Sequence, residues 1–140
     1  MIVSRRELAA LPSMLGASPS QTPEGKNVPS NVYLFDKLTL RHTDVVDYRA
    51  IVDGKTIDGC KFSVHESALS LGNEPHPPHH HNGEEMFLMI DGTLEVTING
   101  KASKISKGSV AFIGSGDQHG IRNVGTTPAK YFVIELGPQR

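Results

Sequence analysis

The feature that most constrains the fold of this chain is a series of short segments rich in β-branched and aromatic residues, each bounded by turn-forming residues. Segments of this length and composition are typical of β-strands. No helical period longer than two turns appears after residue 31. The segments are VYLFDKLTL, VVDYRAIV, CKFSVHESALSL, EMFLMI, TLEVTI, SVAFI and KYFVIEL. The sequence therefore predicts an all-β fold, either a sandwich or a small barrel.

The breaks between these segments contain dipeptides that favour tight hairpins. Asparagine, aspartate and glycine tolerate the positive φ angles that such turns require. The dipeptides are Asp53-Gly54, Asn82-Gly83, Asp91-Gly92 and Asn99-Gly100. Because a hairpin joins antiparallel neighbours, we expect antiparallel sheets.

Residues 85–90 are apolar on both faces of the predicted strand. Side chains alternate along a strand, so Glu85, Phe87 and Met89 share one face. Met86, Leu88 and Ile90 share the other face. One face is expected to line the interior, and the other to be covered by a second sheet, the N-terminal arm or a partner subunit. A homodimer is therefore one expectation for this chain.

The size and charge of the chain limit the classes of protein to consider. A chain of 140 residues suits one domain, which we place at residues 32–140. The 14 basic and 15 acidic residues form no long run of one sign, so nothing indicates a nucleic-acid or membrane-surface partner. The lone Cys60 cannot form an internal disulfide and leaves the compartment open. No apolar run approaches the ~20 residues that cross a bilayer.

Residues 1–31 form an N-terminal arm with two interpretations. Arg5 and Arg6, followed by a modestly apolar stretch, are similar to a weak twin-arginine export signal. Alternatively, Ser4 and Glu7 have the spacing of a capping box and begin a short helix that ends before Pro12. Residues 12–31 lack apolar periodicity and are expected to be a linker. The location is accordingly cytoplasmic, or exported if the signal is functional.

The run of histidines around residue 80 is the strongest chemical signal. On an extended strand His79 and His81 point to the same face, and Glu85 at the start of the next strand can turn back beside them. His119, after a later strand, offers a further imidazole. Imidazoles with one carboxylate suit a divalent transition metal such as Fe, Mn, Ni, Cu or Zn better than calcium or magnesium. Taken alone, three histidines are also compatible with a solvated loop.

The spacing around these residues resembles both motifs of the cupin superfamily. The first motif runs from Gly72 through the two histidines and the glutamate to Gly92, and the second runs from Gly108 through His119 to Asn123. Two positions depart from the family pattern: the stretch from Gly72 to His79 is one residue longer, and Gly114 stands where proline is usual. Neither departure involves a ligand position.

The resemblance implies a jelly-roll β-barrel that holds a metal through four ligands, His79, His81, Glu85 and His119. Four protein ligands on a metal that prefers six would leave two neighbouring positions for water or substrate. The reaction would be dioxygenation with a redox-active ion, or isomerisation, decarboxylation or lyase chemistry otherwise. The alternative is a non-catalytic metal-containing cupin that binds or senses a small molecule.

Three apolar residues near the motifs, Phe87, Met89 and Phe112, are candidates for the substrate pocket, although ordinary core packing explains them equally well. A small apolar pocket with few basic residues nearby favours a compact aromatic or hydroxy-ketone substrate over a sugar phosphate. Three other histidines, His42, His65 and His76, carry no individual signal and are expected at the surface. His76 lies near enough to the motif to serve as a general acid or base.

Overall fold

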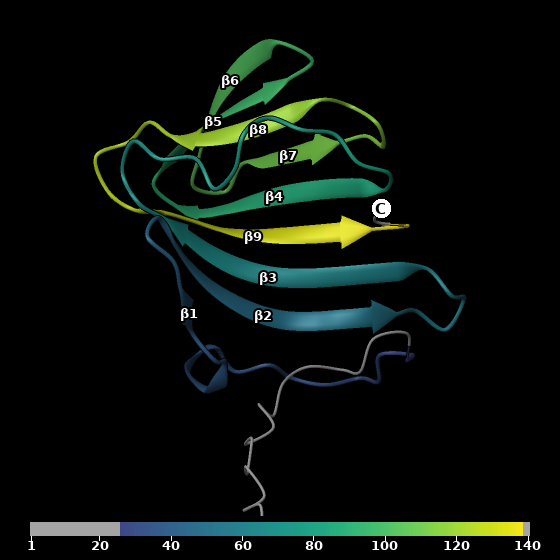
Figure 1. Ribbon diagram of the computed structural model, residues 1–140. Coiled ribbons are helices and arrows are strands. Elements are labelled where there is room, and N and C mark those ends of the chain that lie inside the picture. The colour runs from purple at the N-terminus through teal and green to yellow at the C-terminus, as the bar shows by residue number, and fades with distance from the viewer. Residues whose placement is uncertain (1–25, 139–140) are drawn as a thin grey trace, which may run out of the picture.

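A computed structural model describes residues 26–138 as two antiparallel sheets that enclose one core (Figure 1). The larger sheet has the strand order β1-β2-β3-β9-β4-β7, and the smaller has the order β6-β5-β8. The elements are the 3₁₀ turn η1 (Phe35–Lys37), β1 (Arg41–His42), β2 (Val46–Lys55), β3 (Lys61–Leu69), β4 (Glu84–Asp91), β5 (Thr93–Ile98), β6 (Lys101–Ser106), β7 (Val110–Ile113), β8 (His119–Asn123) and β9 (Ala129–Leu136).

Most neighbouring strands are far apart in the sequence, as a jelly roll requires. The last strand, β9, lies between β3 and β4, and β8 pairs with β5. Figure 1 shows β5, β6 and β8 stacked above the strongly curved larger sheet. The core fills the space between the sheets, and its fully buried side chains include Leu69, Leu94, Val96, Ile113 and Asn123. The predicted all-β jelly-roll barrel is therefore confirmed.

Strand β4 has the alternation that its sequence predicts. Glu85, Phe87 and Met89 are buried against the interior. The residues between them are half-buried on the opposite face of the sheet. The inner face of β4 thus supplies both a carboxylate and apolar side chains to the space between the two sheets.

Residues 32–40 were expected to form a strand, and this prediction is wrong. Lys37 and Leu38 donate backbone hydrogen bonds to Leu34 and Phe35, which closes the 3₁₀ turn instead. The charged pair at Asp36 and Lys37 divides the apolar segment at this point. Strands β6 and β8 were not predicted, because β6 is largely polar and exposed and β8 is short.

Two of the predicted hairpin turns lie elsewhere in the fold. Asp53 and Gly54 are inside β2, opposite Ser63 and Phe62 of β3, and the turn falls at residues 56–60. Asp91-Gly92 carries the chain from one sheet to the other, so β4 and β5 do not pair. At Asn99-Gly100 the expected tight hairpin is present between β5 and β6, and Asn99 has a φ of 47°.

The described part of the N-terminal segment runs along the edge of β2 (Figure 1). Val28 donates a hydrogen bond to the carbonyl oxygen of Lys55, and Lys55 donates one to Lys26. The candidate export signal and most of the arm fall in residues 1–25, outside the described residues. No helix within residues 26–138 is long and apolar enough to span a membrane.

Candidate metal centre and cavity

A short antiparallel bridge brings the two cupin-like motifs together. The backbone N–H of His79 donates to the carbonyl oxygen of His119 at 2.9 Å, and the N–H of His119 donates to His79 at 2.8 Å. This pairing fixes the loop between β3 and β4 against the start of β8. Two imidazoles that are far apart in the sequence therefore share one side of the interior.

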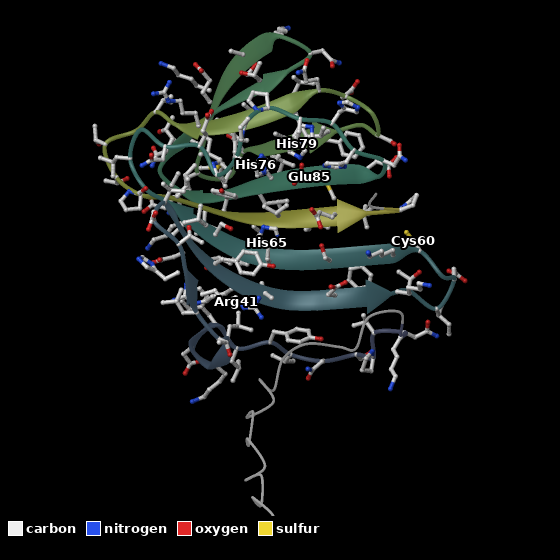
Figure 2. All side chains as sticks on the ribbon, in the orientation of Figure 1. Arg41, Cys60, His65, His76, His79 and Glu85 are labelled. Atoms are coloured by element: carbon white, nitrogen blue, oxygen red, sulfur yellow. The ribbon has the colours of Figure 1, made fainter. Side chains whose placement is uncertain are left out.

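The other two predicted ligands reach the same point from the loop and from β4. The carbonyl oxygen of His81 accepts a hydrogen bond from Gly116, which holds this part of the loop against the turn after β7. Glu85 projects from the inner face of β4. His80 is exposed, as alternation between its neighbours predicts. Figure 2 shows Glu85 and His79 close together between the two sheets, with Cys60 far away at the end of β2 and β3.

The four side chains form a compact cluster. The ring centroids of His79, His81 and His119 are 4.6 to 5.3 Å apart. One nitrogen from each ring lies within 4.8 Å of the others, so these three residues could hold one metal ion. Oε2 of Glu85 lies 2.8 Å from Nε2 of His119 and 3.5 Å from Nε2 of His81. Glu85 thus lies against two of the three imidazoles, while the set of ligand atoms that all lie within 4.8 Å of one another comprises the three histidines.

The hydrogen bonds of two rings leave the lone pair of Nε2 facing the cluster. Nδ1 of His119 lies 2.9 Å from the carbonyl oxygen of Asp117, and Nδ1 of His81 lies 3.3 Å from that of Asn82. A carbonyl can only accept, so each Nδ1 carries the proton and each Nε2 is unprotonated in the neutral ring. Hydrogen bonds of this kind orient histidine ligands at metal sites.

Three buried atoms of the cluster have no hydrogen-bond partner among the described residues: Nδ1 of His79, Oε2 of Glu85 and Nε2 of His119. The close approach between Glu85 and His119 does not change this, because with the His119 proton on Nδ1 both Nε2 and the ionised carboxylate oxygen are acceptors. Buried polar atoms without partners are rare and call for an explanation such as an ion. The donor set of this cluster fits a divalent transition metal.

Burial shifts the pKa of two cluster residues toward their neutral forms. Desolvation raises the pKa of Glu85, and nearby Glu135 raises it further, against the opposing effect of His119. Desolvation lowers the pKa of His79, and the neighbouring His76, His119 and His81 lower it further. A neutral imidazole is the form that binds metal, and a cation beside Glu85 would favour its carboxylate.

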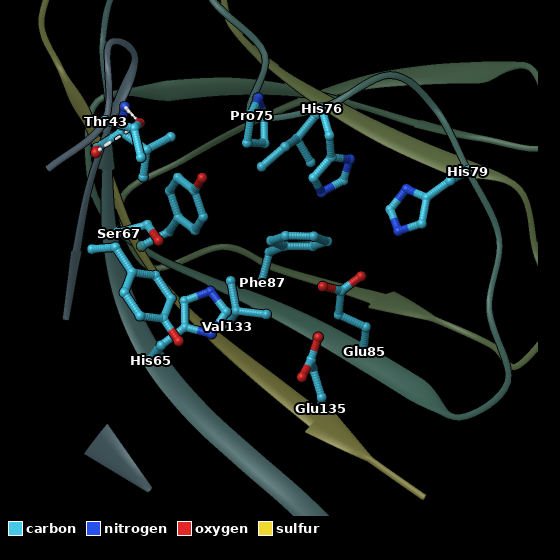
Figure 3. Close-up of a pocket in the computed structure, with 14 residues that line it drawn as sticks. Thr43, His65, Ser67, Pro75, His76, His79, Glu85, Phe87, Val133 and Glu135 are labelled. Atoms are coloured by element: carbon cyan, nitrogen blue, oxygen red, sulfur yellow. Dashed lines mark hydrogen bonds between the residues drawn. The ribbon is translucent and has the colours of Figure 1, made fainter. Parts of the chain in front are cut away.

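A cavity of about 350 Å³ opens beside the cluster (Figure 3). His76, His79 and Glu85 line one end, and Phe87, Ile121 and Val133 form apolar walls. The other end is lined by polar side chains, including Tyr48, His65, Ser67 and Tyr131. No lysine or arginine of the described residues lines this cavity.

A model of the cupin domain family matches residues 69–135 of the chain, a range that contains all four clustered residues. The structure of an RmlC-like cupin from Shewanella frigidimarina superposes with a TM-score of 0.64, at 10% identity, over 79% of this chain and 93% of that one. The chain belongs to the cupin superfamily. A second structural neighbour, the polyketide cyclase RemF from Streptomyces resistomycificus, has a TM-score of 0.63 at 20% identity, over 80% of this chain and 82% of that one.

Among characterised sequences, this cupin is similar to one part of a larger enzyme. It is 30% identical over 77 residues to the mannose-1-phosphate guanylyltransferase of Escherichia coli. The match covers 55% of this chain and only 16% of that enzyme. The cupin thus spans about a sixth of the length of its relative, and the activity of the whole relative does not transfer with the match.

The three candidate pocket residues of this cupin lie in different environments. Phe87 lines the cavity. Met89 is buried in the core and does not border the cavity. Phe112 is 58% exposed on the outer face of β7, because Ala111 and Ile113 take the inward positions of that short strand. The expectation that Phe112 lines the pocket is therefore not met by the structure.

Several cavity residues were not predicted from the sequence. His65 was expected at the surface, but it is half-buried on the inner face of β3 and lines the cavity. Tyr48 of β2 and Glu135 of β9 line it as well. Alternation on residues 61–69 places Ser63, His65 and Ser67 on one face, and this polar face is the one that points inward. His76 is largely exposed but also borders the cavity, with its ring edge-on to His79.

Proposed function

We propose that this cupin is a metal-dependent enzyme that acts on a small organic molecule, with dioxygenation as the first candidate reaction. The observation that carries the proposal is that three buried atoms of one cluster, on His79, Glu85 and His119, have no hydrogen-bond partner within residues 26–138. The unprotonated Nε2 of His81 faces the same point. Such a set of lone pairs supports a bound cation rather than a hydrogen-bonded polar core.

The chemistry available depends on the ion. A divalent metal bound by these four side chains would supply Lewis acidity for isomerisation, decarboxylation or lyase reactions and, if redox-active, the electron-transfer chemistry that dioxygenation requires. The cavity beside the cluster offers room for a substrate next to the ion. Phe87 and Val133 contribute apolar surface that keeps water from the substrate.

A proton acceptor lies beside the cluster. Nδ1 of His76 lies 3.2 Å from the carbonyl oxygen of Pro77, so Nδ1 donates and Nε2 is left as an acceptor. The ring of His76 is 4.3 Å from that of His79 and borders the cavity. His76 is therefore placed to take a proton from a substrate hydroxyl that approaches the metal.

The charge of the cavity supports an uncharged substrate. Glu85 and Glu135 line it, and no lysine or arginine of the described lining is available to bind a phosphate. The relative from Escherichia coli carries a sugar phosphate in its name. The cavity of this chain favours a compact aromatic or hydroxy-ketone compound instead.

The test is turnover by protein reconstituted with one metal at a time. Metal-free protein would be loaded with Fe(II), Mn(II), Ni(II), Cu(II) or Zn(II), and oxygen uptake and product NMR would be recorded with catechol-like and β-diketone compounds. We expect metal-dependent turnover, absent from the His79→Ala/His81→Ala variant. Tight binding without any turnover would favour the alternative, a non-catalytic binding or sensor cupin. Absence of metal-dependent binding as well would contradict both.

A further inference from the structure

We propose that the end of the cavity remote from the histidine cluster is a second substrate subsite, in which His65 hydrogen-bonds a hydroxyl group at the end of the substrate opposite its metal-binding oxygens. The inference rests on the proposed function, because it concerns the same ligand in the same cavity. It goes further by assigning a role to a residue outside the cluster and by defining the substrate at both ends.

The strand register places His65 across the cavity from the histidine cluster. His65 of β3 lies opposite Val133 of β9, and Val133 lies opposite Phe87 of β4. Two strand spacings separate the backbones of His65 and Phe87 by about 10 Å. Glu85 is on the same face of β4, two residues from Phe87. Figure 3 shows His65 and His79 on opposite sides of the cavity, with Phe87 between them.

His65 has hydrogen-bonding capacity that the protein does not use. Its ring is half-buried and packs against Tyr48, with centroids 4.7 Å apart and planes inclined by 41°. No residue among 26–138 forms a hydrogen bond with either ring nitrogen, although the side chain borders the cavity. The ring nitrogens are not among the fully buried atoms without a partner, and the side chain borders the cavity, so they are open to it. The free nitrogens of His65 are therefore available to a ligand.

The ring is set up as a neutral group that can both donate and accept. Desolvation lowers the pKa of His65, while Glu135 acts in the opposite direction. The other polar groups on its side of the cavity are Tyr48 from β2, Ser67 from its own strand and Tyr131 from β9, and Glu85 of β4 lies across the cavity. A neutral imidazole can accept a hydrogen bond from a hydroxyl at one nitrogen and donate one from the other.

The volume and lining of the cavity define the class of ligand. About 350 Å³ corresponds to roughly a dozen water molecules at about 30 Å³ each. A ligand of about that many non-hydrogen atoms can hold one ring between Phe87, Ile121 and Val133. The carboxylates of Glu85 and Glu135 disfavour a negatively charged ligand. The ligand is thus a neutral ring compound with a chelating oxygen pair at one end and a hydroxyl at the other.

A matched pair of probes isolates the hydrogen bond between His65 and the remote hydroxyl group of the ligand. Kojic acid and allomaltol are hydroxypyranones with the same chelating oxygens, and they differ in one hydroxyl at the remote end of the ring. Their dissociation constants would be measured by calorimetry with Zn(II)-loaded protein. We expect the wild-type protein to bind kojic acid about five- to tenfold more tightly, which is the effect of one hydrogen bond.

The variant His65→Phe keeps a ring against Tyr48 and removes both nitrogens. It is expected to bind the two probes equally and to retain the zinc content of the wild type. His42→Phe, at an exposed position of β1, is the matched control and should keep the preference for kojic acid. A role limited to packing on Tyr48 predicts no change in preference in either variant.

Three results would overturn the inference. Equal binding of both probes to the zinc-loaded wild type, or a preference that survives in His65→Phe, would remove the subsite and leave the proposed function intact. Failure of either probe to bind more tightly with zinc than without it would overturn both. If His65→Phe does not fold, nitrogen NMR of the wild-type histidine rings replaces it. The His65 signals should then shift with kojic acid and not with allomaltol, and the same shift with both would refute the subsite.

Discussion

Glu85 is expected to lower the stability of the metal-free fold and to stabilise the metal-bound protein. It is 8% exposed, and burial raises the pKa of its carboxyl group. Without a cation, an ionised carboxylate in this position lowers the stability of the fold. With a cation in contact, the same carboxylate becomes favourable. The residue therefore contributes to stability only in the metal-bound protein at neutral pH.

The variant Glu85→Gln should separate the effect of the buried charge on folding from its effect on metal binding. In metal-free protein at neutral pH we expect the free energy of unfolding to rise by about 1–3 kcal/mol, because a buried charge is replaced by a neutral amide. The increase in Tm that added Zn(II) gives the wild type should be lost. Denaturant unfolding with and without the metal measures both, and Glu84→Gln, on the opposite face of β4, is the control.

The difference in the free energy of unfolding between the metal-free wild type and Glu85→Gln depends on pH in a defined direction. Because the folded pKa of Glu85 lies above its ordinary value of 4.5, the folded metal-free protein takes up this proton more readily than the unfolded chain. Glu85 thus favours folding below pH 4.5, and the contribution is lost as the pH rises through the raised pKa. The gap between the wild type and Glu85→Gln should widen from acid to neutral pH. A zinc-induced increase in Tm that survives in Glu85→Gln would show that Glu85 is not a ligand.

At the scale of single residues, the sequence predicts the cluster better than the cavity. His79, His81 and Glu85 are close in sequence, so alternation and a turn are enough to bring them together. The position of His119 followed from motif spacing, since its contact with His79 depends on a bridge between distant segments. His65 gave no signal, because a single histidine in a strand has no preferred face until the direction of the sheet is known.

Among the elements, η1 is attached to the larger sheet by a cation–π contact with Arg49, which also forms an ion pair inside that sheet. Arg49 of β2 lies 3.1 Å from Oε2 of Glu66 on β3, and its guanidinium lies 4.4 Å from the centroid of the Phe35 ring. Glu66 is 2% exposed, so its charge depends on this single described partner. Arg49 therefore connects the N-terminal segment to the outer face of the sheet.

Removal of Arg49 alone should strongly lower the free energy of unfolding, and removal of both charges should not. Arg49→Met leaves the Glu66 carboxylate buried without a partner and is expected to destabilise the fold by about 3–5 kcal/mol. Arg49→Met/Glu66→Met should recover most of this loss. Chemical denaturation of the two variants gives the values. Equal destabilisation in both variants would show that lost packing, rather than the unpaired charge, determines the cost.

The link between β4 and β5 requires glycine at residue 92. Gly92 has a φ of 79°, and a Cβ there would lie 2.8 Å from both Cα of Ala129 and the carbonyl oxygen of Pro128. Gly59, in the turn after β2, has a φ of 82° and no atom within 4 Å of such a Cβ.

The two glycines should therefore respond differently to alanine. Gly59→Ala is expected to lower stability by about 1–2 kcal/mol through backbone strain alone. Gly92→Ala adds a clash with the backbone of β9 and should lower stability further, by about 3 kcal/mol or more in total. Thermal and urea unfolding compare the two variants. A loss at Gly92 no larger than at Gly59 would contradict the close packing of β9 on this link.

At the element scale, strands with one apolar face could be predicted, and strands around the cavity were harder to orient. In β3 the inward face carries Ser63, His65 and Ser67, whereas Phe62 and Val64 point outward. A cavity that needs polar groups inverts the usual pattern. The strands β6 and β8 were missed because neither contains an alternating apolar run, and they are formed by pairing with β5.

On the scale of the whole molecule, the outer face of the larger sheet carries an apolar row. The register aligns Val64, Ile134, Met86 and Phe112 across β3, β9, β4 and β7. Phe112 is 58% exposed, and Val110 on the same strand is 56% exposed. The other three residues of the row are half-buried, and an apolar row with an exposed end of this kind favours contact with another protein surface. The homodimer expected from the two apolar faces of β4 would cover it.

We therefore expect twice the chain mass in sedimentation velocity at micromolar concentration. Phe112→Glu should give a monomer that keeps the metal content of the wild type, because this residue points away from the cavity. Ile57→Glu, in the exposed turn between β2 and β3, is the control and should remain a dimer. A monomeric wild type at ~100 µM would rule out this dimer.

The convergence of four side chains on one cation is best tested by elemental analysis of two proteins prepared in parallel. Wild type and His79→Ala/His81→Ala would each be loaded with metal and dialysed, and the metal per chain would then be measured. We predict about one ion per wild-type chain and almost none in the variant, because two of the three histidines that could hold the ion are gone. A full equivalent of metal in the variant, or none in the wild type, would contradict the metal centre described for this cupin.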